Sequence, residues 1–252
     1  YPYYDAQQNA LAFDNMLESI RQMPAGDAIL LHASCHNPTG IDPTLEQWQQ
    51  ISEVVSERGL LPLIDCAYQG FGDGLEEDVQ GMKLILEKCP EALITTSCSK
   101  NFGLYNERIG ALSVVAAKAE HCGNVFSQAC NCIRANYSNP PAHGAAIVTT
   151  ILSDSALRQQ WETELAEMRT RIHRMRTELV KNLDALSSER DFSFITAQKG
   201  MFSYSGLSKS EVKYLKDEYA IYAVDSGRIN IAGINDTNLE RLSQAISEAI
   251  SR

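Results

Sequence analysis

The segment ALITTSCSKNFGLYNERIG, residues 92–110, carries the strongest local pattern in the sequence. It opens with ALITTSC, a short apolar run of the kind that forms a buried strand. Lys100 follows two residues after this run, and a lysine at the C-terminal edge of a strand can face the ligand crevice of an α/β sheet. The segment therefore predicts a strand that presents a functional lysine.

Three more apolar runs predict the rest of a sheet, namely AILLHAS at residues 28–34, LLPLIDCA from residue 60 and IGALSVVAA from residue 109. Between the first two, Asp42 and Pro43 have the residue types of a helix N-cap and first helical position, and Gly59 is typical of a helix end. One face of this segment is apolar, at Leu45, Trp48, Ile51 and Val55. Strand, helix and strand in this order predict an α/β fold with a mostly parallel sheet.

The second half of the sequence predicts one long helix and a smaller domain. From Ser153 to about Leu186, apolar residues recur at spacings of three and four, as in an amphipathic helix. We interpret this helix as a connector between domains, with a coiled coil or a bundle helix as the alternatives. Beyond it, short strands are expected in DFSFIT (191–196), GMFSYSGL (200–207), IYAVD (221–225) and RINIAG (228–233), and helices over 209–218 and 236–251. This pattern places a large domain at 1–160, and the connecting helix with an α+β domain at 161–252.

The overall composition excludes some classes of partner. A formal net charge of -10 opposes broad attraction to nucleic acid or to an anionic membrane, and no apolar run approaches the roughly 18 residues of a membrane span. Seven cysteines lack both the regularity of a disulfide framework and the paired spacing of a zinc site, so we expect reduced, mostly buried thiols and no metal. A cytoplasmic protein is expected, with organellar targeting left open.

A lysine needs a particular environment to become a nucleophile, and most lysines are solvated surface residues. A free lysine amine has a pKa of about 10.4, so it must be buried near positive charge to react at neutral pH. Arg108, eight residues after Lys100, could supply that charge and bind a phosphate group.

The lysine segment closely resembles the active-site segment of class I aminotransferases, which are fold type I pyridoxal-phosphate enzymes. The similarity continues, in family order and spacing, through HNPTG (36–40), DCAYQGF (65–71), RANYSNPP (134–141), GMFSYSGL (200–207) and SGRINIAG (226–233). It covers essentially the whole chain and is closest to the bacterial-type aspartate and aromatic aminotransferases. The resemblance implies a large domain built on a mostly parallel sheet, a smaller α+β C-terminal domain, and pyridoxal 5'-phosphate as cofactor.

The resemblance also implies catalytic and cofactor-binding roles. Lys100 corresponds to the lysine that binds the cofactor covalently and then carries the proton between the substrate Cα and the cofactor. Asp65 corresponds to the partner of the pyridine nitrogen, and a turn carboxylate is its alternative. Tyr68 and Asn37 correspond to the groups that contact the cofactor 3′ oxygen, with core packing and a simple turn as the alternatives. The Asn37–Pro38 bond resembles a family position where a cis proline shapes the turn.

Further residues correspond to phosphate-binding and substrate-binding positions of the family. Ser97 and Arg108 match residues that hold the phosphate. Arg228 matches the residue that grips the substrate α-carboxylate with its planar guanidinium, and Asn37 lies at the same site. Arg134 matches a residue from the neighbouring subunit that binds the distal carboxylate of aspartate or glutamate, and Ser138 matches a cofactor contact across the dimer. A homodimer with a shared active site is therefore implied.

The sequence also departs from the family pattern. Family members carry a substantial N-terminal portion before YPYYD at residues 1–5, so the resemblance implies that only the C-terminal portion is present. Sheet strands, a phosphate-cradling helix start and a stacking aromatic belong to that portion. Cys98 also stands where an aromatic residue is common in the family.

These observations favour transamination between L-aspartate and 2-oxoglutarate, which yields oxaloacetate and L-glutamate. An aromatic-amino-acid aminotransferase is the alternative within the family, because related enzymes accept both kinds of substrate. An inactive fragment or a non-catalytic pyridoxal-phosphate-binding module is the alternative from another class. A nicotinamide-dependent dehydrogenase is disfavoured, because GFGDG at 70–74 lacks the strand-turn-helix context of a GxGxxG motif.

Overall fold

The computed structural model describes residues 1–186 and 190–252. Its strands are β1 Tyr4–Asp5, β2 Ala10–Leu11, β3 Ala28–His32, β4 Leu61–Cys66, β5 Ala92–Ser97, β6 Gly110–Val115, β7 Phe202–Tyr204 and β8 Arg228–Asn230. Its α-helices are α1 Phe13–Arg21, α2 Leu45–Glu57, α3 Gln80–Lys88, α4 Ala119–Tyr137, α5 Ala142–Ser153, α6 Ser155–Ala185, α7 Phe194–Ala197, α8 Lys209–Tyr219 and α9 Leu239–Ile250. Two 3₁₀ turns, η1 Glu77–Val79 and η2 Ile231–Gly233, complete the description.

The four apolar runs of the first half form one sheet in the order β3-β4-β5-β6, as the sequence predicts. β3, β4 and β5 are parallel, whereas β6 is antiparallel to β5. The register aligns His32 with Asp65 and Asp65 with Thr95, so the C-terminal ends of the parallel strands meet at one edge. This is the edge where an α/β sheet places its ligands.

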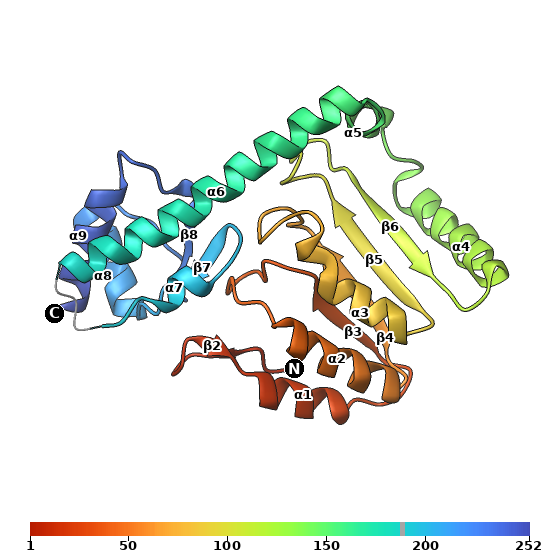
Figure 1. Ribbon diagram of the computed structural model, residues 1–252, viewed down its shortest axis with the longest axis horizontal. Helices are drawn as coiled ribbons and strands as arrows, with labels where there is room; N and C mark the ends of the chain where they lie inside the picture. Colours follow the sequence, from red (N-terminus) through yellow and green to blue (C-terminus); the bar gives the residue numbers. More distant parts are fainter. Residues whose placement is uncertain (187–189) are drawn as a thin grey trace.

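Within residues 1–186 and 190–252, helices pack on one face of the sheet, although continuous apolar runs predict strands that are buried on both faces. Alternate residues, including Ile29, Leu31 and Ile64, are fully buried against a layer formed by α1, α2 and α3 (Figure 1). Leu30 of β3 lies on the opposite face of the sheet and is 49% exposed. Leu112 of β6 lies on that same open face and is 53% exposed. The open face carries the side chain of Asp65, because its register partner His32 lies two residues from Leu30 on the strand.

The start of α2 differs from the sequence-based prediction. Thr44, and not Asp42, is the N-cap: its side chain accepts a hydrogen bond from the Gln47 backbone N–H, and the Gln47 side chain accepts one from the Thr44 N–H. The Asp42 carboxylate is instead engaged by the backbone of the preceding loop. Gly59 follows the helix with φ +62°, as its predicted role at the helix end requires.

The long helix predicted for the second half is present as α6, and it runs from the side of the sheet to a second lobe (Figure 1). Asp154 caps it by accepting two hydrogen bonds from backbone N–H groups, so the helix begins at Ser155, two residues after the predicted start at Ser153. The buried face of α6 packs on α7, α9 and η2, with Leu165, Ile172, Met175 and Leu179 in one core. The domain boundary at 160/161 stays a prediction.

Two predicted strands of the second lobe are wrong. Residues 191–196 are not a strand, because the Asp191 side chain accepts hydrogen bonds from Ser193 and the chain then enters the short helix α7. Phe192, just before this helix, and Ile195, within it, are both buried. Residues 221–225 form no ladder and end in a turn closed by a bond from the Gly227 N–H to the Val224 carbonyl. The other two predicted strands form β7 and β8, which pair antiparallel, and both predicted helices are present as α8 and α9.

The cysteines are all free, but they are less buried than predicted. Cys35, Cys66 and Cys89 are buried, Cys98 and Cys122 are intermediate, and Cys130 and Cys132 are exposed. The exposed pair lies on α4, a helix of 19 residues with no buried side chain. In the part of the chain that the structure describes, no helix combines the length and the apolar character needed to cross a membrane.

Candidate active site

Two strand ends bring the catalytic candidates together. Asp65 is the penultimate residue of β4, and Tyr68 follows three residues later, whereas Lys100 follows the end of β5. Because β4 and β5 are parallel neighbours, these ends lie side by side. The Lys100 amine lies 4.5 Å from the centre of the Tyr68 ring. The predicted lysine and phenol are therefore in contact.

A chain of polar contacts joins Tyr68 to the second lobe. The Asn37 Nδ2 group donates to the Tyr68 hydroxyl at 3.2 Å, and Arg228 Nη1 donates to Asn37 Oδ1 at 3.2 Å. Burial raises the pKa of Tyr68, an effect that the Asn37 hydrogen bond partly offsets. The Asn37–Pro38 peptide bond is cis. Four predicted site residues, Lys100, Tyr68, Asn37 and Arg228, thus form one connected group.

Two members of this group, Lys100 and Arg228, are cations. Among the residues that the structure describes, neither Lys100 nor Arg228 forms an ion pair. The Arg228 guanidinium contacts the Asn37 amide and lies 4.8 Å from the centre of the Phe202 ring. A guanidinium with uncompensated charge in a partly buried position is well suited to bind a carboxylate.

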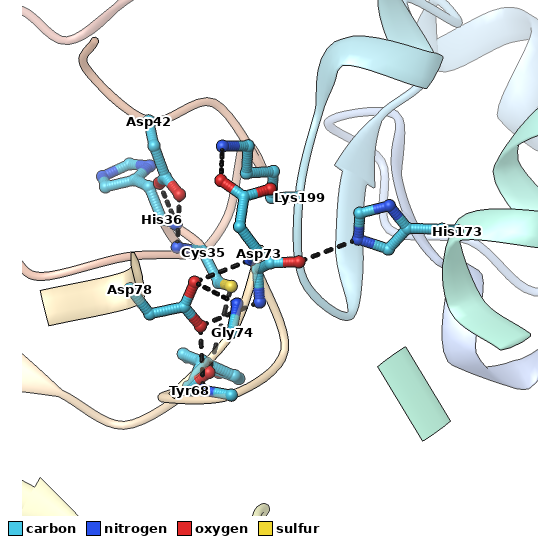
Figure 2. Close-up of polar contacts among 11 residues, drawn as sticks. Cys35, His36, Asp42, Tyr68, Asp73, Gly74, Asp78, His173 and Lys199 are labelled. Atoms are coloured by element: carbon cyan, nitrogen blue, oxygen red, sulfur yellow. Dashed lines mark hydrogen bonds and ion pairs between the residues drawn. The ribbon is translucent and has the colours of Figure 1, made fainter. Parts of the chain in front are cut away.

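The loop that carries Asn37 is held by a carboxylate. Asp42 accepts hydrogen bonds from the backbone N–H groups of Cys35 at 2.7 Å and His36 at 2.9 Å (Figure 2). Burial raises the pKa of Asp42, and these two bonds act in the opposite direction. The His36 ring stacks on Tyr3 with centroids 3.7 Å apart, and burial together with neighbouring His32 lowers its pKa to about 3. His36 is therefore a neutral packing group at physiological pH.

The loop after Tyr68 is held by a second carboxylate. Asp78, which is 5% exposed, accepts hydrogen bonds from the backbone N–H groups of Gly70, Gly72, Asp73 and Gly74 (Figure 2). The amides of the GFGDG segment thus bind an internal carboxylate, so they are not free to cradle a phosphate. This geometry argues against the dinucleotide-binding interpretation of the segment.

We expect Asp78→Asn to destabilise the fold by about 3 kcal/mol, because an amide nitrogen cannot accept from backbone N–H groups and buried donors would lose their partner. The change is measured as a lower urea midpoint. Glu77→Gln is the matched control, because Glu77 is adjacent and exposed, and we expect its midpoint to stay at the wild-type value. Equal midpoints for both variants would contradict the role given to Asp78.

Comparison with known proteins agrees with this geometry. The family model for aminotransferase class I and II matches residues 1–246. The chain belongs to this family. It is 54% identical to the aspartate aminotransferase of Escherichia coli (strain K12) over 246 residues, which cover 98% of this chain and 62% of that protein. It is 49% identical to an aromatic-amino-acid aminotransferase of Pseudomonas aeruginosa over 248 residues, which cover 98% of this chain and 62% of that protein.

Solved structures give the same result for the fold. The aromatic-amino-acid aminotransferase of Burkholderia pseudomallei, covalently bound to pyridoxal phosphate, superimposes with a TM-score of 0.97 at 48% identity, over 99% of this chain and 63% of that one. A mitochondrial aspartate aminotransferase from Trypanosoma brucei gives a TM-score of 0.96 at 42% identity, over 98% of this chain and 65% of that one. The predicted fold type is confirmed, and the chain spans less than two thirds of the length of these relatives.

The predicted phosphate-binding residues lie near Lys100 in sequence, but they form local contacts. The Ser97 hydroxyl accepts a hydrogen bond from the Ser99 N–H at 3.2 Å. Arg108 is exposed, has a positive φ of 53°, and donates to the Tyr105 carbonyl at 2.9 Å. In the described residues neither one contacts Lys100 through a hydrogen bond, so their phosphate-binding role stays a prediction.

Arg134 and Ser138 lie apart from the cluster, on α4 and at its C-terminal end. Both are exposed, and Arg134 Nη1 donates to the Ser138 hydroxyl at 3.1 Å. Figure 1 places α4 on the far side of β6 from the second lobe that carries Arg228. The structure therefore does not bring these two residues to Lys100 within one chain.

Several residues that support the site were not predicted from the sequence. Trp161 of α6 stacks on Phe102 with centroids 4.5 Å apart and donates to the Asn101 carbonyl at 2.7 Å, directly beside Lys100. Lys199 of the second lobe pairs with Asp73 (Figure 2). The Lys199 backbone N–H donates to the Gly40 carbonyl at 2.6 Å. These contacts join segments far apart in sequence, so no local pattern marks them.

Proposed function

We propose that this protein is a pyridoxal-phosphate-dependent aminotransferase that moves the amino group of L-aspartate to 2-oxoglutarate. The observation that carries the proposal is the connected group of Lys100, Tyr68, Asn37 and Arg228, in which an amine and a guanidinium have no acidic partner among the described residues. Family membership and 54% identity to the Escherichia coli aspartate enzyme support it.

The donor set fits pyridoxal phosphate. Lys100 offers an amine to the cofactor aldehyde, Asp65 a carboxylate to the pyridine nitrogen, and the Tyr68 hydroxyl and Asn37 amide offer hydrogen bonds to the ring oxygen. When bound, this cofactor accepts the electron pair that remains when the substrate Cα loses its proton. We assign phosphate binding to Ser97 and Arg108.

Lys100 is assigned the proton transfer at the substrate Cα. Its amine lies against the Tyr68 ring, which limits the directions in which the side chain can move. A neutral amine can take the proton from the substrate Cα. The ammonium that results can then donate this proton to the cofactor. Burial raises the pKa of Tyr68, which favours the neutral phenol as a hydrogen-bonding group.

Arg228 is assigned the substrate α-carboxylate. Its hydrogen bond to Asn37 orients the guanidinium, and the face of Phe202 covers one side of the region. A carboxylate bound there would lie beside Asn37 and Tyr68, and thus on the same side as Lys100. The arrangement would orient the Cα–H bond toward the amine, which is how positioning lowers a barrier.

Arg134 and Ser138 are assigned to the active site of a second subunit, Arg134 for the distal carboxylate of the substrate and Ser138 for the cofactor. Their exposure on a helix without buried side chains is compatible with such a contact. A homodimer is therefore part of the proposal. A cytoplasmic location also stays a prediction, and it rests on the seven free cysteines.

Comparing substrates tests the proposal. We expect the purified protein, loaded with pyridoxal phosphate, to transaminate aspartate with at least about tenfold higher kcat/KM than tyrosine or phenylalanine, because one carboxylate–arginine pair contributes more than about 1.4 kcal/mol. Higher kcat/KM for the aromatic substrates would favour the alternative, since an aromatic-amino-acid aminotransferase is 49% identical. No transamination of any of the three would contradict the proposed reaction.

A further inference from the structure

Arg176 of α6 is a buried cation that the proposed reaction does not use. It is 1% exposed and is the largest fully buried side chain in the described residues. Burial lowers its pKa to about 10, so the guanidinium stays charged at neutral pH. In the described part of the chain it forms no ion pair, and its hydrogen-bond partners are neutral oxygens. A buried charge is costly, which raises the question of what it holds.

The guanidinium binds one short segment at several points. Its Nη2 group donates to the carbonyls of Gly200 at 2.6 Å and Phe202 at 2.8 Å. Its Nη1 group donates to the Ser203 hydroxyl and, at 3.4 Å, to the Ile195 carbonyl. Three of these acceptors belong to residues 200–203, so Arg176 fixes the path of the chain into β7.

That segment supports Arg228 in two ways. β7 is paired with β8, and the register sets Tyr204 opposite Arg228. Phe202, whose carbonyl Arg176 holds, presents its ring to the Arg228 guanidinium at 4.8 Å and stands edge-on to the Tyr68 ring at 6.4 Å. A shift of the Gly200–Ser203 backbone would therefore move both the strand that carries Arg228 and the ring against which it packs.

We propose that Arg176 is a positioning residue, which holds the Gly200–Ser203 segment so that Arg228 is oriented to bind a carboxylate. The inference rests on the proposed role of Arg228. Arginine suits this task because its planar group has five donors in a fixed arrangement, whereas a lysine ammonium is a compact charge with three. A merely structural role predicts lower stability alone, whereas positioning predicts weaker carboxylate binding in a protein that is still folded.

The test compares Arg176→Met and Arg176→Lys with Arg174→Met in the protein loaded with pyridoxal phosphate. Arg174 is the matched control, because it lies on the same helix, is half exposed and pairs with Asp236 at the surface. The probe is succinate, a dicarboxylate without an amino group, and the readout is its Kd well below the unfolding temperature. We expect Kd to rise about tenfold or more for Arg176→Met and by less for Arg176→Lys, and to stay unchanged for Arg174→Met.

Two further measurements separate the possible failures. Cofactor fixed on Lys100 by borohydride shows that each variant is folded around the lysine. If Arg176→Met does not fold, Ser203→Ala replaces it, because it is a milder change in the same contact. Exchange of the Ile231 and Ser205 amides, which bond to Met201 and Gly227 between the two strands, reports the β7–β8 geometry without a ligand, and we expect it to accelerate.

The outcomes are distinct. Unchanged Kd and unchanged amide exchange in a folded Arg176 variant would overturn the positioning role. If Arg228→Ala itself leaves the succinate Kd unchanged, the proposed carboxylate site is wrong, and faster exchange in Arg176→Met would then support only the part of the inference that concerns the backbone.

Discussion

Replacing Lys100 with alanine is expected to reduce kcat for transamination by about a thousandfold or more, because one side chain supplies both the covalent attachment and the proton transfer. The Lys100 amine lies 4.5 Å from the centre of the Tyr68 ring, within the predicted site. Lys100→Arg keeps the charge, but a guanidinium is a poor nucleophile, so we expect a similar loss. Steady-state kinetics with aspartate and 2-oxoglutarate measures the effect.

The matched control for this prediction is Lys83→Ala, because Lys83 is a surface lysine paired with Glu76. Its kcat should equal that of the wild type, since exposed ion pairs contribute about 0 to 1 kcal/mol to stability. If Lys100→Ala kept kcat within tenfold of the wild type, the catalytic role of Lys100 would be refuted.

Removing the Arg228 guanidinium should lower kcat/KM for aspartate by about 30-fold to several thousandfold. This range corresponds to about 2 to 5 kcal/mol, the typical result of removing one partner of a buried charged pair. The loss should come mainly from weaker binding, because Arg228 contacts Asn37 and Phe202 and not Lys100. Arg228→Ala and Arg228→Lys, measured for kcat and KM separately, give the result.

Arg228→Lys should recover only part of the loss, since an ammonium cannot make two parallel hydrogen bonds to a carboxylate. The spectrum of bound cofactor should be retained in both variants, because Arg228 is not assigned to the cofactor. An unchanged kcat/KM for Arg228→Ala would show that another residue binds the α-carboxylate.

The sequence predicted the strands of the sheet because each is a continuous apolar run followed by a turn. The apolar runs alone do not mark which face of the sheet is open, since Leu30 and Leu112 have the same residue type as their buried neighbours. Which face is covered depends on segments elsewhere in the protein, and a run of apolar residues carries no such information. The predicted strand at 191–196 failed for a local reason, because the Asp191 side chain accepts a hydrogen bond from the Ser193 N–H, which favours a turn over an extended chain.

For the site, motif resemblance predicted residues that the structure joins across the whole chain. Arg228 and Asn37 are 191 positions apart and are in hydrogen-bonding contact. The residues that hold these groups in place were not predicted, because Asp42 has the residue type of a helix cap and no local pattern marks Asp78. Arg176 had no local signal at all, since its acceptors are backbone carbonyls that every residue possesses.

Labelling tests most directly whether Lys100 is the cofactor-binding amine. The purified protein is mixed with pyridoxal phosphate, its visible absorbance is recorded, and the product is reduced with borohydride and mapped by peptide analysis. We predict a new visible band and a reduced adduct located on Lys100. Labelling spread over surface lysines such as Lys83 and Lys181, with no defined band, would contradict the assignment of Lys100.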